Sequence, residues 1–337
     1  MTKEVKIGLI YGEGVGKELI GKIFLFKGIF EKKFNVKIKT YDYDNSENVD
    51  DIIAYLNIMK KKMVPVICGP LTGGKVYKIR KSLDLFCKII ELFTFEYFNP
   101  HNMGNLDIFL IRENTSGVYF GEHGIIDNNR VFHKFISSKI EIERLILKAI
   151  DISINRNKKI SILLKSDGMP SISKLWRETV DEILLEVKDK IDIQFMNVDR
   201  GMGDIVRSPN FFDVILTPDI IGDIVADMLV SLFLGSRGMG ASVNMGDGEF
   251  AIYQTIHGSA FDIVGKNIVN PVGQLLSLGL LFKINYIMPE IYHAIKYSID
   301  LTLKDGYRTN DICESKDKKS INTDIFLEKV FEKMVIL

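Results

Sequence analysis

Short apolar runs alternate with helix-like segments along the 337 residues of this chain, and this alternation restricts the possible folds most. The runs 159–164 and 213–216 are largely apolar, as expected of strands buried on both faces of a parallel sheet. The segments 49–62 and 140–155 carry apolar residues at helical spacing. Because strands and helices alternate, we predict the α/β class with a largely parallel sheet.

The charge and the cysteine content exclude several classes of partner. Lysine plus arginine and aspartate plus glutamate both number 44, so no net field attracts nucleic acid or an anionic membrane surface. The longest apolar runs, such as 275–282, are too short to cross a bilayer, and the first residues lack the apolar region of a signal peptide. Three cysteines without metal-type spacing fit free thiols in a reducing compartment. We expect a cytoplasmic protein that binds neither nucleic acid nor membrane.

Two aspartates, Asp223 and Asp227, stand four residues apart at the start of an apolar helix-like segment. Four residues make about one helical turn, so both carboxylates project from one face of a helix. Adjacent carboxylates repel each other unless a charge neutralises them, and a hard divalent cation is the usual solution. The spacing alone leaves two interpretations open, a metal site or a helix-start acid followed by a solvated one.

Several chemically useful side chains follow predicted strands, at the position where open α/β sheets bind ligands. Arg112 ends one apolar run, and its guanidinium fork suits a carboxylate, although pairing with a local acid is the alternative. Tyr119 follows as a candidate proton donor or relay, and Lys165 ends another run. The turn 12–17 lacks the spacing of a P-loop and of a dinucleotide fingerprint, so we predict a tight turn without a phosphate cradle.

A later loop, residues 257–271, follows two glycine-rich turns. Small residues after His257 allow close backbone approach to a ligand, and Asn270 offers amide groups to the edge of a base. A lone histidine in such a loop is more often structural than ligand-binding, so this loop does not decide a function by itself.

The order of these motifs resembles that of the isocitrate/isopropylmalate dehydrogenase family, the metal-dependent β-decarboxylating dehydrogenases. The resemblance covers nearly the whole chain, through Ile7-Gly-Leu-Ile-Tyr-Gly-Glu-Gly-Val-Gly, Arg80-Lys-Ser-Leu-Asp-Leu-Phe, Arg112-Glu-Asn-Thr, Gly222-Asp-Ile-Val-Ala-Asp, His257-Gly-Ser-Ala, Asn270-Pro and Arg308-Thr-Asn-Asp. It implies a two-domain α/β fold with a central cleft that is not the Rossmann fold. The large cofactor-binding domain would contain residues 1–88 and 235–337. The small domain, residues 89–234, would carry the metal site and the interface of a homodimer with shared active sites.

The resemblance also implies roles for the acid, base and metal-binding residues. Asp223 and Asp227 match metal ligands, and Asp199 matches the acid that a second subunit contributes to the same ion. Mg²⁺ or Mn²⁺ held there would chelate the substrate hydroxyl and a carboxylate and act as a Lewis acid. Lys165 matches the lysine that takes the hydroxyl proton, also across the dimer, and Tyr119 matches the residue that protonates the enol carbon.

Substrate and cofactor contacts follow from the same resemblance. Arg80 and Arg112 match two arginines that bind the carboxylates of a 2-hydroxy di- or tricarboxylic acid. Asp262 matches a position at which NADP-using members of the family have a lysine. Its carboxylate would accept hydrogen bonds from a 2′-hydroxyl and repel a 2′-phosphate, which favours NAD. A plain loop acid is the alternative at this position. The implied NAD-binding residues are His257, Gly258, Ser259, Ala260, Asp262, Ile263 and Asn270.

Departures from the family pattern concern the substrate. Ile90 stands at the position of a third carboxylate-binding arginine, and Lys88 could supply a substitute charge. Asp167 replaces an amide of the family. Lys75 and Lys78 could meet a third carboxylate, which favours isocitrate slightly over 3-isopropylmalate. We expect an NAD- and Mg²⁺- or Mn²⁺-dependent oxidative decarboxylase of a 3-substituted malate. The alternative is a catalytically impaired paralogue that binds ligand and regulates a partner subunit.

Overall fold

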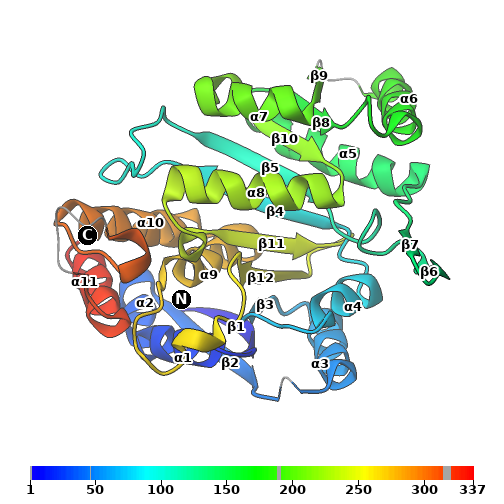
Figure 1. Ribbon diagram of the computed structural model, residues 1–337. Coiled ribbons are helices and arrows are strands. Elements are labelled where there is room, and N and C mark those ends of the chain that lie inside the picture. Colours follow the sequence, from blue (N-terminus) through cyan, green and yellow to red (C-terminus); the bar gives the residue numbers. More distant parts are fainter. Residues whose placement is uncertain (1, 46, 188–190, 314–319) are drawn as a thin grey trace. The chain divides into compact units, whose positions relative to one another are not determined.

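The computed structural model describes residues 2–45, 47–187, 191–313 and 320–337 (Figure 1). The chain forms two compact units, each built from strands and helices, which confirms the predicted α/β class. Unit 1 contains Met1–Leu83, Thr94–His101 and Val230–Leu337, and unit 2 contains Asp84–Phe93 and Asn102–Leu229.

The sheet of unit 1 joins strands from both ends of the chain, in the order β2-β1-β3-β12-β11. Strand β1 pairs in parallel with β2 and β3, β3 pairs in parallel with β12, and β11 runs antiparallel to β12. These strands form part of the core of the unit, because β3 and β11 are buried along their whole length and β1 is buried in its second half. The strands are β1 Lys3–Ile10, β2 Val36–Tyr43, β3 Val66–Cys68, β11 Ala241–Met245 and β12 Ala251–Thr255.

Helix α9 is the central helix of unit 1 and lies against β11 and β12 (Figure 1). All its residues from 272 to 282 are buried, so the helix is surrounded by protein on every side, and most of these side chains are apolar, as expected of a core helix. Helix α3 is a surface element, begun by an Asn48 side chain that accepts the N–H of Asp50 at 3.0 Å. The helices are α1 Gly16–Leu25, α2 Lys27–Phe34, α3 Val49–Lys61, α4 Lys75–Ser82, α9 Val272–Asn285, α10 Pro289–Lys304 and α11 Thr323–Ile336.

The sheet of unit 2 has the order β4-β5-β10-β8-β9. Strands β5, β10, β8 and β9 are parallel, so their carboxyl ends meet at one edge, and β4 runs antiparallel to β5. A separate hairpin joins β6 to β7. The strands are β4 Cys87–Phe93, β5 Asp107–Glu113, β6 His123–Asp127, β7 Arg130–His133, β8 Lys159–Leu164, β9 Asp192–Asn197 and β10 Val214–Thr217.

The helices of unit 2 connect these parallel strands. Helix α5 packs against β5, β8 and β10, and its start is capped by the side chain of Ser138. Just after α5, Arg156 Nε donates to the buried Asp213 at 2.6 Å, which neutralises an acid at the start of β10. The helices are α5 Lys139–Ile154, α6 Pro170–Glu186, α7 Val198–Arg207 and α8 Asp219–Leu234.

Phe26 separates the first two helices, α1 and α2. Strand β9 ends at Asn197, and Asp199 lies in the first turn of α7, where the helix dipole favours an acid. Within the described ranges no helix is long and apolar enough to cross a membrane.

Candidate functional site

Most of the predicted catalytic residues lie at the carboxyl edge of the sheet in unit 2. Arg112 is near the end of β5, Lys165 follows β8, and Asp199 follows β9. Asp223 and Asp227 lie on α8, which follows β10. Because open α/β sheets bind ligands at this edge, it is the candidate site.

Arg112, Tyr119 and Asp223 form one bonded group at this edge. Arg112 Nη1 donates to Asp223 Oδ1 in an ion pair, and Tyr119 Oη donates to Asp223 Oδ2 at 2.8 Å. The guanidinium of Arg112 also lies 5.7 Å from the centre of the Tyr119 ring. The side chain of Arg112 is 2% exposed and that of Asp223 is 39% exposed, so a buried cation holds a carboxylate that solvent or a ligand can reach. The pairing of this arginine with an acid, left open by the sequence, is therefore present.

Two buried acids that sequence reasoning missed hold the loop that carries Tyr119. Glu113 Oε1 accepts the backbone N–H groups of Thr115 and Ser116, each at 2.7 Å, and Asp219 Oδ2 accepts the N–H of Tyr119 at 3.1 Å. Burial raises the pKa of Glu113 to about 7, and the charge of Asp219 adds to this effect. Burial is also the largest cause of the raised pKa of Asp219. Residue type does not reveal burial, so the sequence held no signal for this pair.

Two glycines let this loop and α8 approach β5 closely. Gly117 has φ 82°, and a Cβ added there would overlap the carboxylate of Asp219. A Cβ added at Gly222 would overlap Thr217 Oγ1 and lie 2.9 Å from Arg112 Cγ. The first turn of α8 therefore packs directly on the face of β5 that carries Arg112.

Lys165 and Asp199 form a second bonded group at the same edge. Lys165 Nζ donates to Asp199 Oδ2 in an ion pair whose side chains are 40% and 67% exposed. Asn197 holds the loop after β8 next to the end of β9, because its side chain accepts the Ser166 N–H and donates to Asp167 Oδ2, both at 2.9 Å. The acid at 167 thus has a local bonding partner.

The carboxylates on α8 fit a hard divalent cation by ligand type. Asp223 and Asp227 lie one helical turn apart and are both partly exposed. Across the part of the chain that the structure describes, no group of three or more His, Cys, Asp or Glu is placed to hold a metal ion. A site for Mg²⁺ or Mn²⁺ built on these two acids therefore needs additional oxygen ligands from water, substrate or a second chain.

Strand β4 places Lys88 and Ile90 beside β5. Lys88 is directly opposite Arg112 in the antiparallel register, and Ile90 is opposite Leu110. Lys88 is 8% exposed and Ile90 is 1% exposed. The residue at the family's arginine position is thus a core residue of unit 2.

On helix α4 of unit 1, lysines form ion pairs with acids from elsewhere in the same unit. Arg80 lies on α4 and is 8% exposed. Lys75, also on α4, forms an ion pair with Glu13, and Lys78 forms one with Asp50 at 2.7 Å. The two lysines expected to meet a third substrate carboxylate therefore already have carboxylate partners.

The loop after β12 fits a polar cofactor. The His257 Nε2 and Ser259 Oγ atoms are buried and have no hydrogen-bond partner among the described residues. Burial lowers the pKa of His257, so its ring stays neutral near pH 7. The predicted tight turn after β1 packs against this loop: Val15 N–H donates to Ser259 O at 2.9 Å, and a Cβ at Gly14 would overlap that carbonyl. Buried polar atoms that lack partners, beside a glycine turn, suit NAD.

The remaining cofactor-loop residues have different surroundings. Gly258 is exposed, with open space where a Cβ would lie, and Ala260 has φ 43°. The short 3₁₀ turn η3 Phe261–Ile263 leaves Asp262 exposed, which suits a contact with a ribose hydroxyl. Ile263 instead packs against a small apolar cluster of Val15, Leu19 and Val269.

Asn270 has internal partners for its side-chain amide. Its Nδ2 donates to Asp311 Oδ2 at 3.1 Å, and its Oδ1 accepts the N–H of Val272 at 3.0 Å. The expected contact of Asn270 with a base edge would therefore have to share or replace one of these bonds.

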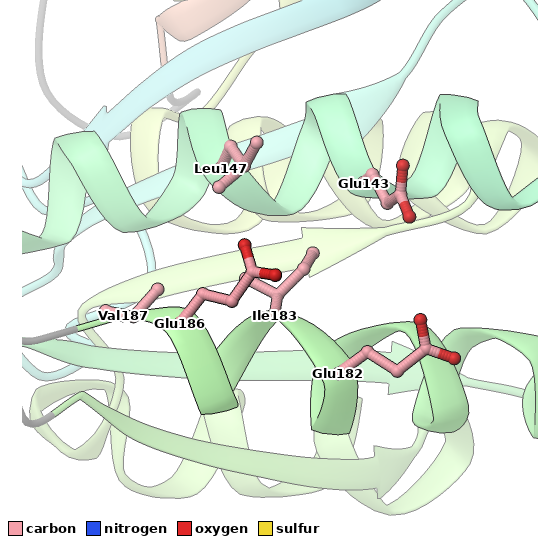
Figure 2. A pocket seen from close by; sticks show the side chains of 6 residues that line it. All are labelled: Glu143, Leu147, Glu182, Ile183, Glu186 and Val187. Atoms are coloured by element: carbon pink, nitrogen blue, oxygen red, sulfur yellow. The ribbon is translucent and has the colours of Figure 1, made fainter.

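A cavity of about 410 Å³ lies between α5 and α6 in unit 2 (Figure 2). Three glutamates and three apolar side chains line it, and one of the glutamates, Glu182, forms an ion pair with Lys139. Its described lining residues include no cation that could bind a substrate carboxylate, so the cavity does not suit the chemistry expected of this chain. The lining residues are Glu143, Leu147, Glu182, Ile183, Glu186 and Val187.

Comparisons with known proteins bear on this arrangement. A family model described as isocitrate/isopropylmalate dehydrogenase matches residues 6–330. The chain is 32% identical over 357 aligned positions to the 3-isopropylmalate dehydrogenase of Buchnera aphidicola subsp. Pemphigus spyrothecae, covering 96% of this chain and 97% of that protein. It is 32% identical over 346 positions to the 3-isopropylmalate dehydrogenase of Prochlorococcus marinus (strain MIT 9312), covering 94% and 96%. The crystal structure of isocitrate dehydrogenase from Methylococcus capsulatus matches with a TM-score of 0.84 at 26% identity, covering 98% and 99%. The expected fold is confirmed.

Proposed function

We infer the reaction from one premise: this chain belongs to the isocitrate/isopropylmalate dehydrogenase family. Its class is therefore that of the β-decarboxylating dehydrogenases. Within that class, the chain oxidises and decarboxylates a 3-substituted malate with NAD and Mg²⁺ or Mn²⁺. The observation that supports this most directly is the bonded group of Arg112, Tyr119 and Asp223, which joins a carboxylate-binding cation, a proton donor and a metal-type ligand.

Two groups supplied from outside the chain complete this chemistry. Asp223 and Asp227, with Asp199 of a second subunit, would hold the cation, and the loop after β12 would hold NAD. When bound, the cation supplies Lewis-acid stabilisation of negative charge and NAD accepts a hydride. The exposed Asp262 favours NAD over NADP, because a carboxylate repels a 2′-phosphate.

The protein's own side chains bind the substrate and transfer its protons. Arg112 binds a carboxylate, and Arg80 in unit 1 binds another. Lys165 accepts the hydroxyl proton as a neutral amine, after it has given up its bond to Asp199 and released a proton to solvent. Tyr119 Oη, now donating to Asp223 Oδ2, delivers a proton to the carbon that has lost its carboxylate.

The proposed substrates differ in the substituent at carbon 3 of the malate. The sequence favoured isocitrate because Lys75 and Lys78 were available in principle for a third carboxylate. Both lysines instead bond acids of their own unit, and the two relatives at 32% identity are named 3-isopropylmalate dehydrogenase. We therefore place 3-isopropylmalate first. Isocitrate stays the second candidate because one of the matching solved structures is an isocitrate dehydrogenase.

A homodimer with shared sites is part of the proposal. The acids on α8 need further oxygen ligands, and a second copy can offer Asp199. Large apolar side chains are exposed on the β6–β7 hairpin, where Ile125 is 79% exposed, and on α8, where Ile224 is 56% exposed. Their exposure would be explained if a second copy of the chain covered them. We also place the protein in the cytoplasm, where its free thiols stay reduced.

The test is NADH formation by the purified protein with Mn²⁺ and either 3-isopropylmalate, isocitrate, homoisocitrate or tartrate. We expect turnover with 3-isopropylmalate and slower turnover with isocitrate. No turnover with any of the four, together with saturable binding of substrate or nucleotide, would replace the proposal with the regulatory paralogue.

The metal assignment has a separate test. Asp223→Asn removes a charged ligand and should abolish turnover while leaving the melting temperature within a few degrees of wild type. Asp181→Asn, which removes an exposed carboxylate on α6, is the matched control and should stay active. Full turnover by Asp223→Asn would show that the metal lies elsewhere.

A further inference from the structure

We propose that His123 and His133, on the two strands of the β6–β7 hairpin, form a binding site for a divalent transition-metal ion such as Zn²⁺. The site differs from the acids on α8 in its ligands. Imidazole nitrogens suit Zn²⁺, Ni²⁺ and Cu²⁺, whereas carboxylates suit Mg²⁺ and Mn²⁺. None of the residues assigned to the proposed reaction takes part in it, so the site does not depend on that reaction.

The strand register places the two histidines directly opposite each other. His123 of β6 pairs with His133 of β7 in an antiparallel ladder. At the neighbouring pair, the backbone N–H of Lys134 donates to Glu122 O at 2.8 Å. Because hydrogen-bonded and non-hydrogen-bonded pairs alternate along such a ladder, His123 and His133 form a pair of the second kind, at which side chains come closest.

The separation of the two rings fits a shared ion. Their centres are 5.0 Å apart, and the ring planes differ by 30°. A Zn–N bond is about 2.0–2.1 Å long, so two imidazole rings bound to one tetrahedral ion hold their centres about 5 Å apart. Both histidines are exposed, so their rings can rotate until a nitrogen of each faces the ion, without displacing core residues.

A backbone carbonyl sets the tautomer of His123. Its Nδ1 lies 3.3 Å from Gly121 O, and a carbonyl oxygen can only accept, so Nδ1 carries the hydrogen. The lone pair of the neutral ring is then on Nε2, which is free to bind a metal ion in this tautomer. Histidines that bind metals commonly donate their other ring N–H to a carbonyl, which fixes the ring orientation. His123 already makes this kind of contact.

The basic side chains next to the pair are neutralised by acids of the hairpin. Successive side chains of a strand point to opposite faces, so Lys134 points away from the face that carries His133. Lys134 forms an ion pair with Glu122, and Arg130 forms one with Asp127. These two cations therefore oppose the binding of a positive ion at the histidines only weakly.

A bound ion would stabilise an element that has little support of its own. Strands β6 and β7 form a sheet of only two strands. A two-stranded hairpin is at best marginally stable in water, and an ion that binds the paired strands favours the paired state by mass action. Two protein ligands leave the other positions to water, so binding is more readily reversed than at a structural zinc site with four protein ligands.

The test is calorimetric titration of Zn²⁺ into the full chain, with excess Mg²⁺ present to occupy the acids on α8. We expect His123→Asn and His133→Asn each to weaken Zn²⁺ binding at least about 10- to 100-fold, the loss caused even by removing a residue that only bonds to a metal ligand. His293→Asn on α10, which removes an exposed histidine, is the matched control and should bind Zn²⁺ as the wild type does.

Hydrogen exchange of the hairpin amides gives a second readout. Zn²⁺ should slow this exchange in the wild type and in His293→Asn but not in the two hairpin variants, because only a bound ion links the strands. Equal Zn²⁺ affinity in the wild type and both hairpin variants would overturn the site. Loss of affinity in only one of the two variants would overturn the shared ion, and an equal loss in His293→Asn would show that the effect is not specific to the pair.

Discussion

Replacing Glu113 with glutamine should stabilise the protein above neutral pH, because it removes a charge from a buried position. Burial raises the pKa of Glu113 to about 7 from an ordinary value of 4.5. A carboxyl group whose folded-state pKa lies above its unfolded value binds its proton more tightly in the folded state. Its contribution to stability is therefore complete below pH 4.5 and is lost as the pH rises through about 7.

The magnitude follows from the same two values. Each tenfold change in proton affinity corresponds to about 1.4 kcal/mol, so the difference between 4.5 and about 7 amounts to about 3 kcal/mol. Glutamine keeps an oxygen acceptor for the N–H groups of Thr115 and Ser116 and stays neutral at every pH, so it resembles the protonated acid. Between about pH 5 and about pH 8 the wild type should lose about 2 to 3 kcal/mol relative to Glu113→Gln.

Urea denaturation at a series of pH values and one protein concentration measures this difference. The matched control is Glu178→Gln on α6, whose side chain is 57% exposed and whose removal should leave the pH dependence of unfolding unchanged. Parallel pH profiles for wild type and Glu113→Gln would refute the reasoning, because the ionisation of Glu113 would then not be linked to folding.

Two further substitutions test the packing at the candidate site. Ile90→Arg should lower the free energy of unfolding by about 3–5 kcal/mol, because the arginine would be buried without a partner. Its control is Ile125→Arg on the exposed β6–β7 hairpin, which should change the free energy of unfolding by less than about 0.5 kcal/mol. Urea denaturation measures both. Gly222→Ala should lower the free energy of unfolding by about 1–3 kcal/mol, and with it the melting temperature, because the new Cβ would overlap Thr217 Oγ1. Its control is Gly28→Ala on α2, which should not lower the melting temperature, because a Cβ there has open space around it. Equal stabilities within either matched pair would contradict the packing described.

The fold was predictable where one periodicity dominated. The runs that became β8 and β10 are largely apolar, and the segments that became α3 and α5 have helical spacing, so local pattern and final structure agree. Strands β11 and β12 were not predicted, because each is only five residues long and lies beside a glycine-rich turn. Strand β4 was not predicted either, and its burial follows from its pairing with β5.

The sequence predicted which residues form the candidate site but not which bonds join them. Motif order identified Arg112, Tyr119 and Asp223, and the structure joins all three. The bond between Lys75 and an acid of the turn after β1 could not be predicted from local pattern, because the two residues are 62 apart in the chain. Roles that depend on burial, such as that of Glu113, require the folded environment and cannot be derived from residue type.

The split composition of unit 1 has a consequence for synthesis on the ribosome. Strand β3 is complete once Cys68 has left the ribosome. Its neighbour β12 is formed by residues 251–255, which are synthesised only after the whole of unit 2. At translation rates of about 5–20 residues per second, one edge of β3 stays unpaired for roughly ten seconds or more. Unit 2 can assemble its sheet during that interval. An unpaired strand edge can pair with other nascent chains. A chaperone would therefore matter most while the first three strands of unit 1 wait for β12, because it could cover the unpaired edge of β3.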